Sequence, residues 1–425
     1  MKIHFSGIGG TAIGPLALIA HQAGYTVSGS DKQESQYIEY LRKHGIRDIS
    51  IGQTAEQIEK ENTRQPIDWL VYSSAVAIEN PNHPELVYAR ENEIKLSKRD
   101  ELLNKILNET GNKLIAVAGT HGKTTTTAMA IWLFKQLGIP VSYSVGAKIP
   151  FGDMGDFDTK SEYFVYECDE FDRNFLAFHP HISLITGIDY DHHEIFPTRS
   201  DYQAAFRQFL DQSSHIIGWE SDAAKNALSV AENYTLLFEE NAAIDTIDLP
   251  GRVNRQDAWQ VIQCLHELTN ETVETLIKKM ESFPGLSRRF EKLADGLYTD
   301  YAHTVPKIEG CLQLAQELSK NVVVVYEPLT NRRQHYIQDD YADLFKGVKK
   351  LYWVPSYLAR EDPAQAILSP SDLIAKMHNS NIAEPAELDK NLKQNISAHL
   401  AAGDLVVCMS GGGGHSLDEW LRHEF

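Results

Sequence analysis

Short runs of β-branched and other apolar residues alternate along the chain with stretches whose apolar positions recur at helical spacing. This alternation predicts parallel sheets covered by helices, because each strand returns to its sheet through a helix. In the first part of the chain, strands are predicted at Ile3–Ser6, Thr26–Ser28 and Trp69–Ser73, and helices at Pro15–Ala23, Arg90–Ile94 and Lys98–Leu107.

The alternation restarts twice, after the polar pair Gly111-Asn112 and after the segment Ser282–Ser287, and both segments are predicted linkers. The middle part predicts strands at Leu114–Ala118, Tyr163–Glu167 and Ile182–Thr186, and helices at Tyr202–Asp211 and Arg255–Glu267. The last part predicts strands at Leu297–Tyr301, Val322–Tyr326, Lys350–Trp353 and Asp404–Met409, with a helix at Lys307–Leu318. We therefore expect an α/β protein of three domains, residues 1–108, 109–286 and 287–425.

Composition and charge limit the classes of partner. Of the 425 residues, 40 are Lys or Arg and 59 are Asp or Glu, which gives a formal net charge of -19. That sign disfavours nonspecific binding to nucleic acid and to anionic membranes, so an anionic substrate needs local positive groups or a metal ion. The four cysteines form no CxxC pair, and neither a signal peptide nor a membrane span is evident. We expect a cytoplasmic protein.

The segment Ala118–Thr125 carries the strongest chemical signal. It reads Ala-Gly-Thr-His-Gly-Lys-Thr-Thr and lies between a predicted apolar strand and a predicted helix. Glycines there let backbone N–H groups surround phosphate oxygens, Lys123 reaches the outer phosphates, and the Thr124 hydroxyl is placed to bind Mg²⁺. The segment departs from the general phosphate loop at Val117, where a glycine is usual. It predicts a site for a nucleoside triphosphate.

A second glycine turn follows the first predicted strand. Gly7, Gly9 and Gly10 fit the spacing of a dinucleotide-binding turn, and Asp31 follows at the distance of a ribose-binding acid. The turn therefore favours a nucleotide pyrophosphate at the first domain without indicating which nucleotide. Taken alone, it equally fits a dehydrogenase, and that alternative leaves the lysine-bearing loop unexplained.

Two acidic segments follow predicted strands of the middle domain. One is Glu167–Asp172, and the other, Asp189–Glu194, includes two histidines. Because parallel strands end at the same edge of a sheet, both segments are expected beside the phosphates, where carboxylate oxygens suit Mg²⁺. In the last domain, three polar segments are candidates for substrate binding: Arg288-Arg289, Thr299–His303 and Glu327–Arg333.

At this point the chain resembles the Mur ligase family over essentially its whole length. The resemblance rests on Ile8-Gly9-Gly10, Ser28–Asp31, Tyr72–Val76 with Asn80-Pro81, Ala118–Thr125, Glu167–Asp172, Asp191-His192 and Gly251–Asn254. It implies a Rossmann-like domain for a UDP-sugar, a central ATP-binding domain and a Rossmann-like domain for the acceptor. At Asp257 this chain departs from the family, which has an asparagine there.

The resemblance also implies site residues. ATP is expected at Gly119, Thr120, His121, Gly122, Lys123, Thr124, Thr125, Asn254 and Arg289, and Mg²⁺ at Thr124, Glu170 and His192. UDP-N-acetylmuramate is expected at Gly7, Gly9, Gly10, Asp31, Ser73 and Ser74. Catalytic roles fall to Lys123 and His192, while Arg333 and His303 orient the acceptor.

The activity implied is ATP-dependent amide formation in peptidoglycan synthesis, through an acyl phosphate, by a monomer or homodimer. Alanine-adding members carry Tyr-Gly-His-His-Pro and Gln-Pro-His-Arg segments, where this chain has Tyr301–Pro306 and Glu327–Thr330. The acceptor is therefore L-alanine or, as in relatives that add a recycled peptide, a tripeptide. A nucleotide-binding protein without ligase activity is the remaining alternative.

Overall fold

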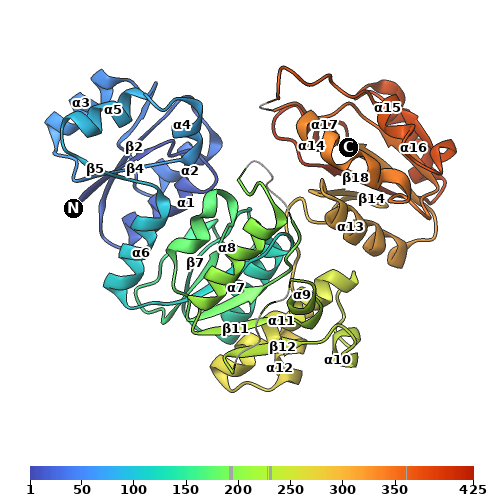
Figure 1. The fold of residues 1–425 in the computed structure, drawn as a ribbon, viewed down its shortest axis with the longest axis horizontal. Helices are drawn as coiled ribbons and strands as arrows, with labels where there is room; N and C mark the ends of the chain where they lie inside the picture. Colours follow the sequence, from blue (N-terminus) through green and yellow to red (C-terminus); the bar gives the residue numbers. More distant parts are fainter. Residues whose placement is uncertain (191–194, 227, 229–231, 360) are drawn as a thin grey trace. The chain divides into compact units, whose positions relative to one another are not determined.

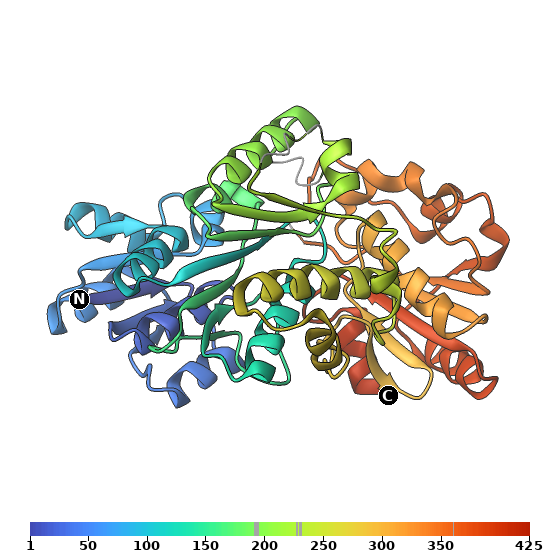
Figure 2. The ribbon, with the colours of Figure 1, turned by 90° about the horizontal axis from the view of Figure 1, so that it is seen from below.

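The computed structural model describes residues 1–190, 195–226, 228, 232–359 and 361–425. Within them the chain forms two compact units, residues 1–241 with 257–283 and residues 242–256 with 284–425. The first unit contains two β-sheets and the second contains one, each with its own helices (Figure 1, Figure 2). These three parallel-rich sheets confirm the predicted α/β class.

The first sheet has five parallel strands in the order β3-β2-β1-β4-β5. Its strands are β1 Lys2–Ser6, β2 Thr26–Asp31, β3 Ile49–Ile51, β4 Trp69–Tyr72 and β5 Lys95–Ser97. Its helices are α1 Ile13–Gln22, α2 Gln36–Lys43, α3 Ala55–Arg64, α4 Ser74–Glu79, α5 Pro84–Glu91 and α6 Arg99–Thr110. The strand order reverses at β1, so the carboxyl ends of β1 and β4 border the crevice in which such sheets bind ligands.

The second sheet has the order β12-β11-β10-β6-β9-β7-β8, and β8 pairs antiparallel with β7. Its strands are β6 Lys113–Ala118, β7 Val141–Ser144, β8 Gly155–Asp156, β9 Tyr163–Glu167, β10 Ile182–Ile185, β11 His215–Trp219 and β12 Tyr234–Leu237. Its helices are α7 Lys123–Leu137, the 3-10 helix η1 Phe171–Ala177, α8 Arg199–Asp211, α9 Glu220–Lys225, α11 Arg252–Thr269 and α12 Val273–Met280. Because β6 lies between β9 and β10, the loops that follow these three strands meet at one edge.

The third sheet has the order β13-β14-β18-β15-β16-β17, with β13 antiparallel to β14. Its strands are β13 Glu291–Ala294, β14 Leu297–Asp300, β15 Val322–Glu327, β16 Lys350–Trp353, β17 Ala383–Pro385 and β18 Leu405–Ser410. The helices of this unit are α10 Ala242–Asp245, α13 Val305–Leu318, α14 Asn331–Ile337, η2 Gln338–Ala342, α15 Pro370–Ile374, η3 Ser380–Ile382, α16 Lys390–Ala401 and α17 Leu417–Glu424. Every residue of β15 and β18 is buried, as expected for central strands.

Local sequence explains several helix boundaries. Helix α8 begins with a capping box in which the Thr198 hydroxyl accepts the Asp201 N–H and the Asp201 carboxylate accepts the Thr198 N–H. Helices α6 and α7 end at Gly111 and Gly138, both in the left-handed conformation that glycine adopts without steric penalty. The predicted helix over Arg90–Ile94 is wrong. Helix α5 ends at Glu91, and the chain then turns into β5 because Glu93 takes a positive φ of 56°.

All four cysteines are free and buried: Cys168, Cys264, Cys311 and Cys408. Within the described residues, no helix combines the length and the apolar character needed to cross a bilayer.

Candidate active site

A glycine loop joins β6 to α7 in the second sheet. Gly119 and Gly122 adopt φ of 144° and 76°, a region that L side chains rarely enter. A Cβ atom on Gly119 would lie 2.8 Å from the Gly187 carbonyl oxygen, so the loop packs tightly on the chain after β10. Helix α7 begins directly after this loop, and the first N–H groups of a helix have no acceptor within the helix itself. The loop therefore has the geometry of a phosphate cradle.

Lys123 and Glu170 form an ion pair at this loop. The Lys123 Nζ donates to Glu170 Oε2 at 2.6 Å and to the Gly119 carbonyl oxygen at 2.5 Å. The Glu170 side chain is completely buried. Burial lowers the pKa of Lys123, but the charges of Glu170 and Asp169 outweigh it and raise that pKa overall. The lysine is thus held as a cation beside a buried carboxylate.

Thr124 and Glu167 place further oxygen atoms beside the pair. The Thr124 hydroxyl donates to Glu167 Oε1 at 2.8 Å, and Glu167 Oε2 accepts the Gly146 N–H at 2.7 Å. A hydroxyl and two carboxylates are hard oxygen donors that suit Mg²⁺, so the residues present fit this ion. Glu167 was not singled out from the sequence as a ligand. His192 lies outside the described residues, and within those residues no group of three or more His, Cys, Asp and Glu is placed to hold a metal.

Thr120 and His121 tie the glycine loop to the chain after β10. The Thr120 hydroxyl contacts the Asp189 carbonyl oxygen and the Tyr202 hydroxyl, each at 2.7 Å. The His121 Nε2 lies 3.2 Å from Asp189 Oδ2, and this contact with a further one to Lys225 holds the pKa of Asp189 well below its usual range. Asp189, the first residue of the second acidic segment, is thus bound to the glycine loop through His121. Thr125 is half-buried in the first turn of α7.

Asp257 of α11 is buried beneath the glycine loop. Its Oδ1 lies 3.0 Å from the position that a Cβ on Gly122 would take. Burial raises the pKa of Asp257 to about 8, and the Thr126 hydroxyl lowers it only in part. The Asp257 carboxyl group is therefore largely protonated at neutral pH. Asn254 lies in the first turn of α11, in the part of this helix that belongs to the second unit, and its Nδ2 donates to the Pro250 carbonyl oxygen at 2.9 Å.

In the first sheet, the turn after β1 is closed by Asp31. Gly7 takes a φ of 81°, and the Gly10 N–H donates to the Gly7 carbonyl oxygen at 3.1 Å. Asp31 Oδ2 accepts the Gly9 N–H at 2.8 Å, while Oδ1 accepts the Lys32 N–H. The structure thus brings all four predicted residues together, and Asp31 supports the turn itself.

Ser73 and Ser74 follow β4 on the other side of β1. The Ser73 N–H donates to the Ser6 carbonyl oxygen at 3.1 Å, and the Ser73 Cβ lies 3.3 Å from where a Cβ on Gly7 would be. The Ser74 hydroxyl donates to Asp172 Oδ2 at 3.3 Å. Asp172 has a positive φ of 55°, a strained conformation of the kind found at binding sites. Within the first unit, Asp172 therefore links the two sheets.

In the second unit, His303 lies after β14 and is buried. Its Nδ1 lies 2.7 Å from the Tyr301 carbonyl oxygen, which can only accept, so Nδ1 carries the proton. Burial and the nearby cations Lys307, Arg333 and Arg289 hold the pKa of His303 well below its usual range. The ring is therefore neutral, with Nε2 as an acceptor.

Arg289 and Arg333 lie on either side of this histidine in the sequence. The Arg289 guanidinium lies over the Tyr301 ring at 4.9 Å from its centroid. The Arg333 N–H donates to the Thr330 hydroxyl at 3.4 Å, and Thr330 has a positive φ of 54°. The structure therefore gathers these cations around His303, near the carboxyl ends of β14 and β15, two strands that are separated by β18.

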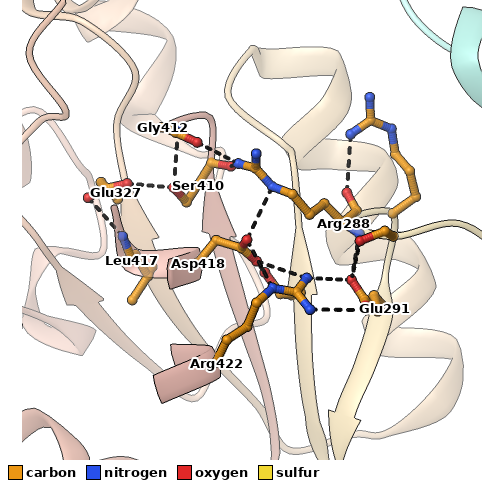
Figure 3. Close-up of polar contacts among 11 residues, drawn as sticks. Arg288, Glu291, Glu327, Ser410, Gly412, Leu417, Asp418 and Arg422 are labelled. Atoms are coloured by element: carbon orange, nitrogen blue, oxygen red, sulfur yellow. Dashed lines mark hydrogen bonds and ion pairs between the residues drawn. The ribbon is translucent and has the colours of Figure 1, made fainter. Parts of the chain in front are cut away.

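A polar network surrounds the glycine segment after β18 (Figure 3). The Arg288 guanidinium donates to the carbonyl oxygens of Ser410 and Gly412 at 3.1 and 2.7 Å. Glu327 accepts the Ser410 hydroxyl and the Leu417 N–H. Burial raises the pKa of Glu327. Glu327 is therefore turned toward β18 and α17 and fixes the segment between them.

Two family models match the chain. The model of the Mur ligase family, catalytic domain, covers residues 2–110, and the model of the Mur ligase middle domain covers residues 117–267. The UDP-N-acetylmuramate–L-alanine ligase of Clostridium perfringens is 30% identical over 455 residues, covering 97% of this chain and 95% of that protein.

Solved structures share the fold over the whole chain. The UDP-N-acetylmuramate–alanine ligase MurC of Thermotoga maritima matches with a TM-score of 0.75 and 23% identity, covering 100% of this chain and 98% of that one. A murein peptide ligase from Psychrobacter arcticus matches with a TM-score of 0.63 and 21% identity, covering 99% of each chain.

Proposed function

The chain belongs to the Mur ligase family, and from that premise we propose that it joins UDP-N-acetylmuramate to L-alanine in an ATP-dependent step of peptidoglycan synthesis. The observation that carries this proposal is the meeting of Lys123, Thr124 and Glu170 at one glycine loop. A cation, a hydroxyl and a buried carboxylate beside a helix N-terminus are the groups needed to hold a triphosphate with its metal.

The first chemical step activates the carboxylate. An oxygen of the lactyl carboxylate attacks the γ-phosphorus of ATP, the bond to the β,γ-bridging oxygen breaks, and ADP leaves. Lys123 neutralises the charge on the transferring phosphoryl group, while the loop from Gly119 to Gly122 with Thr125 holds the other phosphates. A free carboxylate is a poor acyl donor because its leaving group would be an oxide. The acyl phosphate supplies phosphate as the leaving group.

Thr124, Glu170 and Glu167 are the described residues that would hold Mg²⁺, and we retain His192 as a further ligand. Bound there, Mg²⁺ would neutralise part of the phosphate charge. The ion pair between Lys123 and Glu170 holds both side chains at the glycine loop, where Lys123 also donates to the Gly119 carbonyl oxygen.

The second step forms the amide. The amine attacks the acyl carbon, a tetrahedral intermediate collapses, and phosphate leaves with an oxygen that came from the carboxylate. We assign Arg333 and neutral His303 to the acceptor, since a guanidinium can bind a carboxylate bidentately and His303 Nε2 can accept a hydrogen bond from an ammonium or amine. Arg289 and Asn254 are assigned to ATP.

The sugar nucleotide is assigned to the first sheet. Gly7, Gly9 and Gly10 present a turn at the strand-order reversal, with Asp31 closing it and Ser73 and Ser74 beside it. We also propose domain boundaries at residues 108/109 and 286/287, a cytoplasmic location, and a monomer or homodimer that binds neither nucleic acid nor membrane.

A tripeptide acceptor is the second candidate. Leu329 stands where alanine-adding members have a histidine, and its Cβ would lie 3.0 Å from a Cβ on Gly411. Glu327 stands where those members have a glutamine, and it accepts the Ser410 hydroxyl and the Leu417 N–H. Two acceptor contacts are therefore altered.

Phosphate release from ATP with UDP-N-acetylmuramate decides between the candidates when L-alanine, glycine, L-serine and the tripeptide are supplied separately. Stimulation by L-alanine supports the proposal. Stimulation by the tripeptide alone reassigns the acceptor. No release with any amine refutes ligase activity.

A further inference from the structure

A buried carboxylate bridges the two strands that carry the first glycine turn. Glu85, in the first turn of α5, accepts the Ser6 hydroxyl at 2.5 Å and the Ser30 hydroxyl at 2.8 Å with the same oxygen, Oε2. Ser6 and Ser30 are direct partners across β1 and β2. The Glu85 side chain is only 1% exposed, and the mechanism above gives it no role.

The backbone of the two serines makes several of the contacts that hold the turn. The N–H groups of Gly7 and Ile8 donate to the Ser30 carbonyl oxygen at 2.9 and 3.0 Å. The Ser6 carbonyl oxygen accepts the N–H of Ser73, and Asp31, which closes the turn, directly follows Ser30. Glu85 therefore binds the two residues whose carbonyl oxygens hold the turn and Ser73, and one of them, Ser30, directly precedes Asp31.

Packing alone does not require a carboxylate here. The same face of the sheet is covered farther on by apolar contacts of Leu70, Leu86 and Ile58. Around Glu85 the layer is instead polar: His4 Nε2 lies 3.7 Å from Oε1, and Gln53 donates to the Ser6 hydroxyl at 3.2 Å. Burial opposes ionisation, but His4 and the two serines lower the pKa of Glu85 overall. A buried charge is thus maintained at this point.

We propose that Glu85 is a positioning residue for the sugar nucleotide, because it fixes Ser6 and Ser30 and through them the Gly7–Gly10 turn and Asp31. This role rests on the proposed function, in which that turn takes the UDP pyrophosphate.

The test is steady-state phosphate release at saturating ATP and acceptor, with UDP-N-acetylmuramate varied. Glu85→Leu keeps the volume and removes both hydrogen bonds, so its KM for the sugar nucleotide is expected to rise roughly tenfold. Its KM for ATP and its kcat are expected to stay near those of the wild type, since the ATP loop lies on the other sheet. Glu85→Gln retains an acceptor oxygen and should recover most of the affinity.

Ser97→Ala is the matched control, because it removes a buried hydrogen bond from Trp69 Nε1 in the same sheet, at 2.9 Å, away from the turn. Its KM should not change. An unchanged KM in Glu85→Leu, or equal losses for both substrates, overturns the positioning role. If Glu85→Leu does not fold, Ser30→Ala removes one of the two bonds and should still raise the KM roughly threefold. No rise in that variant overturns the proposal.

Failure of the proposed ligase function can be distinguished from failure of the positioning role of Glu85. If the wild type shows no release that depends on UDP-N-acetylmuramate, ligase activity is refuted. Calorimetric titration of the wild type and Glu85→Leu with UDP then tests the positioning role alone. Weaker binding by the variant supports it, and equal binding overturns it.

Discussion

Replacing Asp257 by asparagine should change how the stability of the first unit depends on pH. Asp257 is buried beneath Gly122, and its pKa rises from 3.8 to about 8 on folding. Because the folded pKa is the higher one, folding favours the protonated acid. The resulting stability is fully present below pH 4 and is lost as the pH rises toward 8. Asparagine has the same shape and does not titrate, so the variant should lack this loss.

The magnitude follows from the slope of this linkage. Between the two pKa values, each pH unit removes about 1.4 kcal/mol from the wild type relative to the variant. From pH 6 to pH 8 the difference is therefore roughly 2 kcal/mol, and it levels off above pH 8. For a unit of this size, that corresponds to a relative shift in melting temperature of roughly 4 to 8 °C.

The assay is thermal unfolding of both proteins at pH 6, 7, 8 and 9, followed by intrinsic fluorescence. The quantity compared is the difference in melting temperature between variant and wild type at each pH, which removes the titration of groups common to both. Asp211→Asn, an exposed substitution on α8 in the same unit, is the control and should leave the difference flat. Parallel profiles for Asp257→Asn and the wild type would refute the buried, protonated acid.

Three further substitutions test the site. Lys123→Ala removes the cation of the glycine loop and should lower ligation at least a hundredfold, while UDP-sugar binding by calorimetry persists; full turnover would remove the loop from the mechanism. Gly119→Ala forces a Cβ against the Gly187 carbonyl at a φ of 144° and should destabilise the first unit by roughly 2 kcal/mol or more in denaturant unfolding, whereas wild-type stability would contradict the packing. Arg333→Ala should raise the KM for the acceptor roughly tenfold with the KM for ATP unchanged, and an effect on ATP instead would move Arg333 to the nucleotide.

The sequence predicted the central strands and the glycine loops, since each depends on contiguous residues. Apolar runs such as Val322–Tyr326 are long and buried, and β15 occupies nearly the same residues. Short edge strands such as β8 and β17 were missed, because two or three partly exposed residues carry no periodicity. The helix predicted to end at Ile94 ends at Glu91 instead, because the positive φ of Glu93 follows from no local sequence pattern.

Site contacts between segments that are distant in the sequence could not be predicted from it. That Glu167 reaches Thr124 follows from the pairing of β6 with β9, which opposes Val117 and Glu167, and no local motif encodes it. Glu85 offers only a weak signal, an acid next to Leu86 and close to Ala89, which are buried on the same helix. Its partners Ser6 and Ser30 lie far from it in the sequence, so only the folded sheet reveals the bridge.

In the proposed reaction, the γ-phosphoryl group of ATP is transferred to the substrate carboxylate at the Lys123 loop. UDP-N-acetylmuramate labelled with ¹⁸O in its lactyl carboxylate tests this directly, by mass spectrometry of the phosphate released during ligation. The released phosphate is expected to carry one ¹⁸O atom, because a carboxylate oxygen leaves with phosphorus when the amide forms. Amide formation with unlabelled phosphate would contradict it.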